Sequence, residues 1–164
     1  MKKIIVYYSM LGNTEYAANK IAEATGADLL RIEPEKAYPD KGAKKFIWGG
    51  KSAVFGEKPP LVPYDFKAQE YDLVILGTPV WASNITPPLR TFVCDNADAL
   101  KNKKIAVFTC YSGGGAEKAA EKLRKLLDIP SFEAELILTD PKDKPTEENE
   151  EKLKRFCEKI NGLN

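Results

Sequence analysis

Continuous runs of apolar residues recur along the chain and are separated by segments with helical periodicity. Lys3–Tyr8, Leu73–Leu76 and Ile105–Phe108 consist mainly of aliphatic, β-branched and aromatic residues, which is typical of strands buried on both faces. The short segment Asp28–Ile32 and the partly alternating segment Phe132–Leu138 predict two further strands, the second at a sheet edge. The pattern therefore predicts five strands.

Helical segments fill the intervals between these strands. Helices are predicted over Glu15–Ala24, from Pro87 to about Leu100, from about Ala116 to Leu127 and over Glu147–Ile160. Residues 33–70 are too long for a bare loop, and we expect a helix near Lys41–Val54. Strict alternation of strands and helices predicts an α/β fold with three layers. Its core would be a doubly wound, five-stranded parallel sheet of order 2-1-3-4-5.

The length and charge of the chain limit the classes of protein to which it can belong. Its 164 residues predict a single domain over 1–164, and the net charge of +1 offers no basic excess for nucleic acid or an anionic membrane. No apolar run approaches the roughly 20 residues of a membrane span. The apolar run near the N-terminus is also too short for a secretory signal, so a cytoplasmic protein is expected.

Cysteine and histidine usage excludes several kinds of chemistry. The cysteines Cys94, Cys110 and Cys157 are odd in number and lack CxxC spacing, which argues against a disulfide framework or a zinc site. Histidine is absent, and this removes Ser-His-Asp and Cys-His catalysis. No side chain stands out as a catalytic acid, base or nucleophile, and no metal site is predicted.

Three loops leave the carboxyl ends of strands that the predicted order places side by side. These loops are residues 9–14, 78–86 and 109–115. In doubly wound sheets, ligands bind beyond the carboxyl ends of the strands where the strand order reverses. The three loops are therefore expected to converge on one crevice.

The first loop has the composition of an anion site at a helix N-terminus. The hydroxyls of Ser9 and Thr14, the amide of Asn13 and the bare backbone of Gly12 can surround an anion beside unsatisfied N–H groups. The loop contains no lysine, so neutral donors are expected to hold a terminal phosphate. The alternative is that Asn13 or Thr14 only caps the helix.

The second and third loops supply candidates for contact with a planar ligand. Trp81 can offer a flat apolar face to an aromatic ring, although it can equally fill core space beneath its loop. The glycines following Ser112 allow the backbone to approach a ligand closely, or form a flexible turn. Tyr111 can stack on a ring or lie on the surface. The coincidence of all three loops at one edge favours a binding site.

At these residues the sequence resembles the flavodoxin family, in particular its short branch with YxSxxGNT, GxPVW and GGG motifs. Here the motifs are YYSMLGNT, GTPVWASNITPPLRTF and CYSGGG, and the resemblance covers nearly the whole chain. It implies one non-covalent FMN, with its phosphate in the first loop and its ring between the other two. The implied cofactor-binding residues are Ser9, Met10, Leu11, Gly12, Asn13, Thr14, Thr78, Pro79, Val80, Trp81, Ala82, Asn84, Ile85, Cys110, Tyr111, Ser112, Gly113 and Gly114.

The resemblance implies electron transfer by the flavin, as an oxidoreductase of one of two kinds. The first is a carrier that shuttles one or two electrons between a reductase and an acceptor enzyme, as a monomer or weak homodimer. The second is an NAD(P)H-dependent FMN reductase acting on quinones or similar small acceptors. A flavodoxin-like interaction domain without turnover is a third reading, which the phosphate loop and Trp81 argue against.

Two features of the chain bear on the choice between these functions. Carriers of this family are usually acidic, whereas this chain is near neutral and has five lysines against two acids between Asp40 and Lys58. That excess is either a solvated helix face, a docking patch or a basic rim for NAD(P)H. Cys110 is expected to be a small residue near the flavin edge. Its alternative role is a redox-active thiol whose pKa the helix N-terminus lowers.

Overall fold

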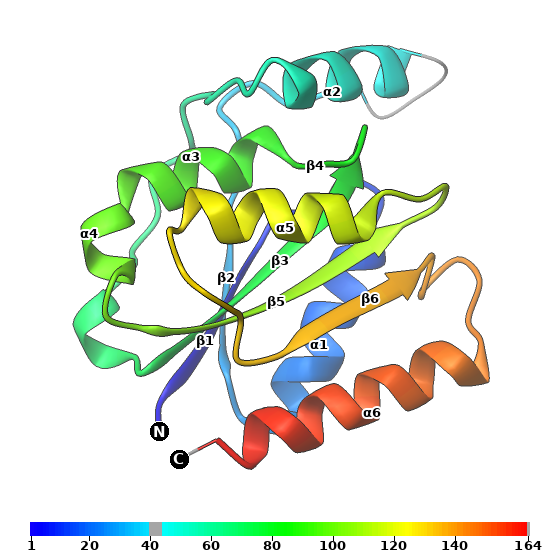
Figure 1. Ribbon diagram of the computed structural model, residues 1–164. Coiled ribbons are helices and arrows are strands. Elements are labelled where there is room, and N and C mark those ends of the chain that lie inside the picture. Colours follow the sequence, from blue (N-terminus) through cyan, green and yellow to red (C-terminus); the bar gives the residue numbers. More distant parts are fainter. Residues whose placement is uncertain (40–43, 164) are drawn as a thin grey trace.

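A parallel sheet of five strands forms the centre of the molecule (Figure 1). The computed structural model describes residues 1–39 and 44–163, with the backbone alone for 44–46. The sheet runs β2-β1-β3-β5-β6, and every pair along it is parallel. The strands are β1 (Lys3–Tyr7), β2 (Asp28–Arg31), β3 (Leu73–Trp81), β5 (Lys104–Tyr111) and β6 (Glu135–Thr139), and the short β4 (Asn84–Ile85) pairs with β3.

Helices cover both faces of this sheet. The helices are α1 (Asn13–Thr25), α2 (Lys44–Val54), α3 (Pro87–Asp95), α4 (Ala97–Leu100), α5 (Ala116–Leu126), α6 (Glu147–Asn161) and the 3₁₀ turn η1 (Ala68–Glu70). One apolar core lies between the sheet and α1 with α6, and a second lies between the sheet and α3 with α5 (Figure 1). Alternate residues of β1 explain the two layers, since Ile5 packs into the first core and Val6 into the second.

The predicted architecture is confirmed. The parallel strands have the predicted order 2-1-3-4-5 once they are counted without the two-residue β4. Most helix and strand boundaries agree within a few residues. The single helix predicted from Pro87 to Leu100 is wrong, because the chain forms α3 and α4 with a break at Asn96. There the Asn96 amide donates to the Phe92 carbonyl, so the side chain competes with the helical backbone.

The second predicted loop is largely strand, which corrects the expected end of the third strand at Leu76. The backbone of β3 continues to pair with β5 as far as Pro79 and Cys110. A two-residue turn at Ala82 and Ser83 then returns the chain into β4. Their φ angles of 49° and 57° are both positive, the signature of a type I′ hairpin turn. This turn could not be recognised from the sequence, because neither residue is glycine or asparagine, which type I′ turns favour.

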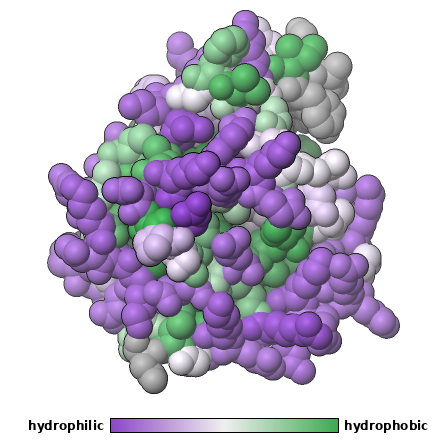
Figure 2. All heavy atoms as spheres, viewed as in Figure 1, coloured by the Kyte–Doolittle hydropathy of each residue, from purple (hydrophilic) through white to green (hydrophobic). Residues whose placement is uncertain are grey.

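Helix α2 lies over the carboxyl end of the sheet beside β4 (Figure 1). It overlaps the helix predicted near Lys41–Val54, of which residues 41–43 lie outside the described part. Its outer side exposes Ile47, Trp48 and Val54, with Phe55 just after it, and Figure 2 shows apolar spheres over this helix. Among the described residues, no helix is both long and apolar enough to cross a membrane.

Candidate functional site

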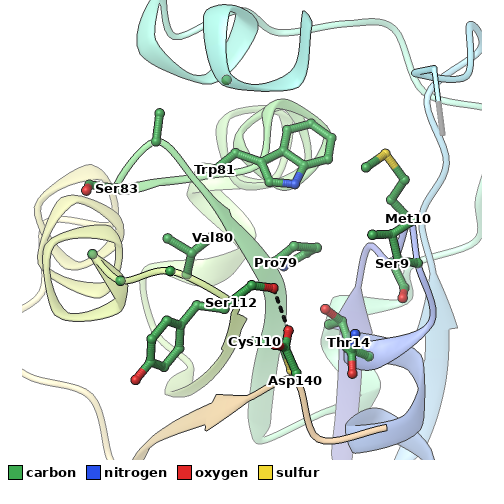
Figure 3. A pocket seen from close by; sticks show the side chains of 18 residues that line it. Ser9, Met10, Thr14, Pro79, Val80, Trp81, Ser83, Cys110, Ser112 and Asp140 are labelled. Atoms are coloured by element: carbon green, nitrogen blue, oxygen red, sulfur yellow. Dashed lines mark hydrogen bonds between the residues drawn. The ribbon is translucent and has the colours of Figure 1, made fainter. Parts of the chain in front are cut away.

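A cavity of about 610 Å³ opens at the carboxyl ends of β1, β3 and β5 (Figure 3). Its volume lies within the roughly 300–1,000 Å³ range of small-molecule sites. It is lined by Ser9, Met10, Leu11, Asn13, Thr14, Gly50, Pro79, Val80, Trp81, Ala82, Ser83, Cys110, Tyr111, Ser112, Gly113, Gly114, Gly115 and Asp140. The three loops that the sequence singled out therefore converge on one hollow.

Four residues of the predicted set lie outside this lining. Thr78 is buried below the cavity, where its hydroxyl lies 3.0 Å from the Thr86 hydroxyl and accepts the Thr86 N–H. Ile85 belongs to the core, and the Asn84 amide closes the hairpin turn through the Ala82 carbonyl. Gly12 is the N-cap of α1 with φ 94°, a left-handed conformation that suits glycine. These residues shape the loops and do not face the cavity.

Four further lining residues were not predicted from the sequence. Ser83 and Gly115 flank the expected motifs, and a Cβ at Gly115 would meet the Ser83 side chain, so the two loops touch. Gly50 of α2 and Asp140 after β6 come from segments without a recognisable signal. The adjacent glycines at 49 and 50 were the one sequence feature that could have indicated this contact, because glycines in a helix let another segment or a ligand lie close to its backbone.

The 9–14 loop presents unsatisfied backbone donors to the cavity. In the first turn of α1, the N–H of Glu15 donates to the Ser9 hydroxyl at 3.2 Å. Within the described part of the chain, the N–H groups of Asn13 and Thr14 have no acceptor. A helix N-terminus carries a partial positive charge. The loop is thus suited to an anion, as the sequence indicated.

The Thr14 hydroxyl is the least satisfied polar group of this loop. Thr14 is 1% exposed, and its Oγ1 forms no hydrogen bond of ordinary geometry with any described residue. It lies beside the Cys110 thiol, which is only a weak partner. Because a buried hydroxyl without a partner costs about 1–3 kcal/mol, its position at the cavity wall indicates that a ligand atom completes it.

Asn13 has a different role from the one predicted. Its Oδ1 accepts the backbone N–H groups of Lys142 and Asp143, at 2.9 and 3.2 Å. Its amide nitrogen donates to the Asp143 carboxylate at 2.8 Å. The side chain therefore fastens the β6–α6 connection to the 9–14 loop and leaves its backbone N–H for a ligand. The alternative that Asn13 or Thr14 caps the helix is wrong as well, since the N-cap residue is Gly12 and, among the described residues, neither side chain accepts an N–H group of α1.

The 9–14 loop contains no lysine of its own, but cationic side chains from other segments lie beside it. The ammonium group of Lys142 lies 3.4 Å from the Leu11 carbonyl, close above Gly12. Lys142 is 131 residues from Leu11 in the sequence, so no local pattern could reveal it. On the other side of the loop, Arg31 of β2 donates to the Ser9 carbonyl at 3.1 Å. Cationic side chains therefore support the loop from two directions.

The opposite end of the cavity is aromatic. The Trp81 indole meets the rings of Tyr8 and Tyr38 edge to face, with centroids 5.8 and 5.1 Å away. A Cβ at Gly49 would lie 3.0 Å from the indole, so α2 packs directly against it. Burial raises the pKa of Tyr38 to about 12 and that of Tyr8 further, and both phenols stay neutral. Figure 3 shows the indole with its nitrogen edge toward the cavity.

The third loop forms an open wall beside a buried carboxylate. A Cβ at Gly113 or Gly114 would meet nothing within 4 Å, so these glycines leave free space for a ligand. The Ser112 hydroxyl donates to Asp140, and Lys144 pairs with the same carboxylate at 3.1 Å. Asp140 is therefore held in place at the cavity edge (Figure 3).

Cys110 lies in the cavity wall as a neutral thiol, so the alternative of an activated cysteine is wrong. The residue is 4% exposed, and burial raises its pKa to about 12. The thiolate is the reactive form. We therefore expect Cys110 to resist iodoacetamide in the native protein at pH 8, while the partly exposed Cys94 is alkylated. Peptide mass spectrometry checks this, and rapid native labelling of Cys110 would contradict it.

The cavity thus joins an anion-binding end to an aromatic end, which is suited to a phosphorylated ring compound. The family model described as Flavodoxin matches residues 2–160 of the chain. Among solved structures, a putative flavoprotein from Bacteroides eggerthii has a TM-score of 0.71 at 23% identity, covering 84% of this chain and 87% of that one.

Two further structures resemble this chain. A flavoprotein from Lactobacillus acidophilus, solved in complex with FMN, has a TM-score of 0.69 at 22% identity and covers 87% of this chain and 95% of its own. The flavodoxin of Megasphaera elsdenii, solved in its two-electron reduced form, has a TM-score of 0.59 at 23% identity. The match covers 99% of this chain and 100% of the Megasphaera elsdenii chain. At these low sequence identities, the similarity to the three structures shows a shared fold and no more.

Proposed function

Since this chain belongs to the flavodoxin family, we propose that it binds one FMN non-covalently in the cavity and transfers electrons between partner proteins. The partners would be a reductase that supplies electrons and an enzyme that accepts them. The observation that carries the proposal is the buried Thr14 hydroxyl, which has no hydrogen bond of ordinary geometry with the described residues and lies at a helix N-terminus that opens on the cavity. A phosphate oxygen is the acceptor that this hydroxyl and its neighbouring N–H groups suit.

The residues of the cavity fit FMN at both ends. The 9–14 loop would hold the phosphate through the Thr14 hydroxyl and the N–H groups at the start of α1. Pro79, Val80 and Trp81 would contact the ring system from the side of β3, and the loop at Gly113 would approach it from β5. When bound, the flavin supplies the capacity to accept and release one or two electrons.

The chain's own contribution is to bind, orient and exclude water. The aromatic group Tyr8, Tyr38 and Trp81, with α2 packed on it, keeps one end of the cavity dry and neutral. The glycines of the third loop allow backbone to lie close to the ligand. Because burial keeps the Cys110 thiol protonated, the cavity wall offers no competing thiolate. These features suit an electron carrier.

A second candidate function is an NAD(P)H-dependent reductase that passes electrons to a small acceptor such as a quinone. The observation in its favour is the exposed Lys51, which follows the cavity-lining Gly50 on α2. A cation on this helix can attract the phosphates of a nicotinamide nucleotide. The same residue would equally serve a carrier by attracting an acidic partner.

Anaerobic mixing of the FMN-loaded protein with NADPH distinguishes the two functions. We expect the visible absorption of the oxidised flavin to persist with NADPH alone and to disappear when a catalytic amount of a flavodoxin reductase is added. Rapid bleaching by NADPH alone, slowed by Lys51→Gln at low ionic strength, would overturn the carrier proposal in favour of the reductase. Lys118→Gln, an exposed change on α5, is the matched control.

A further inference from the structure

The connection between β6 and α6 places a positive charge beside the 9–14 loop. The Lys142 ammonium group lies 3.4 Å from the Leu11 carbonyl and would be 2.9 Å from a Cβ at Gly12. We propose that Lys142 pairs with the phosphate of the bound flavin and makes the protein prefer FMN to unphosphorylated riboflavin. This inference rests on the proposed FMN binding and adds a residue that lies outside the three loops.

The backbone of Lys142 is fixed while its side chain keeps its freedom. The Asn13 side chain accepts the Lys142 N–H at 2.9 Å and binds Asp143 on both its N–H and its carboxylate. These bonds hold the β6–α6 connection against the N-terminus of α1. The side chain of Lys142 is half exposed, and its flexible stem lets the ammonium group turn toward an anion in the loop.

The charge of Lys142 is available, whereas that of Lys144 is not. Among the described residues, the Lys142 ammonium group has two polar partners, the Leu11 carbonyl at the long distance of 3.4 Å and the Asp143 carboxylate at 4.0 Å. Lys144, two residues away, pairs with the buried Asp140 at 3.1 Å. Asp143 in turn is hydrogen-bonded by the Asn13 amide. A ligand phosphate would therefore be the strongest partner open to Lys142.

The 9–14 loop by itself offers no positively charged side chain to a phosphate. Its donors to a phosphate are the unsatisfied N–H groups of α1 and the Thr14 hydroxyl, which forms no ordinary hydrogen bond with the described residues although the residue is 1% exposed. These groups are neutral, and a phosphate monoester carries close to two negative charges at neutral pH. The glycine at position 12 leaves the space in which the Lys142 side chain lies. Loop and lysine thus form one anion site from distant parts of the chain.

Titration of the apoprotein with FMN and with riboflavin tests this inference by binding alone. Lys142→Met removes the charge and keeps the backbone bonds to Asn13. We expect it to weaken FMN binding about threefold to fivefold at low ionic strength, because an exposed ion pair contributes up to about 1 kcal/mol, and to leave riboflavin binding within about twofold. At about 1 M salt the difference for FMN should vanish. Lys142→Arg should retain most of the affinity.

The outcomes separate this inference from the proposed function. Lys154→Met, an exposed charge removal on α6, should leave both affinities unchanged, and thermal melting should show all variants equally folded. Equal FMN affinity of wild type and Lys142→Met at low salt would overturn the role of Lys142 while FMN binding stands. Equal losses for FMN and riboflavin would also overturn it, since they indicate a structural effect. Failure of the wild type to bind FMN would overturn both proposals.

Discussion

Thr14→Val is expected to stabilise the ligand-free protein by about 1 kcal/mol and to weaken FMN binding by roughly tenfold to a hundredfold. Valine has nearly the shape of threonine, so the buried site stays filled while a hydroxyl that lacks an ordinary hydrogen bond to the described residues disappears. In the complex, the same change removes a hydrogen bond to a charged phosphate, which contributes about 1.5–3 kcal/mol. Urea denaturation of the apoprotein and FMN fluorescence titration measure the two effects.

Thr109→Val provides a matched control for this prediction. The Thr109 hydroxyl is also buried and also lacks a hydrogen-bond partner within the described residues, but it does not line the cavity. It should gain similar stability and keep its FMN affinity within about twofold. If Thr14→Val and Thr109→Val bound FMN equally well, the Thr14 hydroxyl would not be a phosphate ligand.

Gly77→Ala is expected to destabilise the protein by about 3 kcal/mol, the upper range for overpacking a core. Gly77 of β3 lies opposite Phe108 of β5 in the sheet register. A Cβ at position 77 would be 2.2 Å from Cζ of the Phe108 ring, and further ring atoms would lie within 3 Å. Phe108 is fully buried and cannot move aside. Denaturant unfolding monitored by circular dichroism measures the loss.

Phe108→Leu distinguishes this clash from a general loss of backbone flexibility. Leucine removes the ring atoms that the new methyl group would meet. The double variant Gly77→Ala/Phe108→Leu should therefore be more stable than the sum of the single changes allows, by at least about 1 kcal/mol. Strict additivity of the two changes would show that Gly77 is needed for another reason.

The parts of the fold that could be predicted are those encoded by local pattern. Segments such as Ile4–Tyr7 in β1 are apolar throughout because the strand is buried on both faces. Alternation of these strands with helices then predicted a parallel sheet. The path from Gly77 to Asn84 could not be predicted as a hairpin, because pairing with β5 and β4 holds Ala82 and Ser83 in a conformation that their side chains disfavour.

The site was predictable in its loops and less so in the roles of single side chains. The motif SMLGNT placed Thr14 correctly at the cavity, since a hydroxyl at a helix N-terminus is a local feature. The use of Asn13 as a link to Lys142 and Asp143 depends on a contact between distant segments. Asp140 and Gly50 likewise reach the cavity only through the tertiary fold. A local sequence pattern cannot reveal such contacts, because they join residues that are far apart in the chain.

The most direct test of the central claim is retention of FMN by the purified protein. The account predicts that protein mixed with excess FMN and then desalted keeps close to one flavin per chain, visible in its absorption spectrum. It also predicts that titration quenches the fluorescence of FMN and that riboflavin binds more weakly because it lacks the phosphate. A colourless protein after desalting, with FMN fluorescence unchanged on titration, would contradict the account.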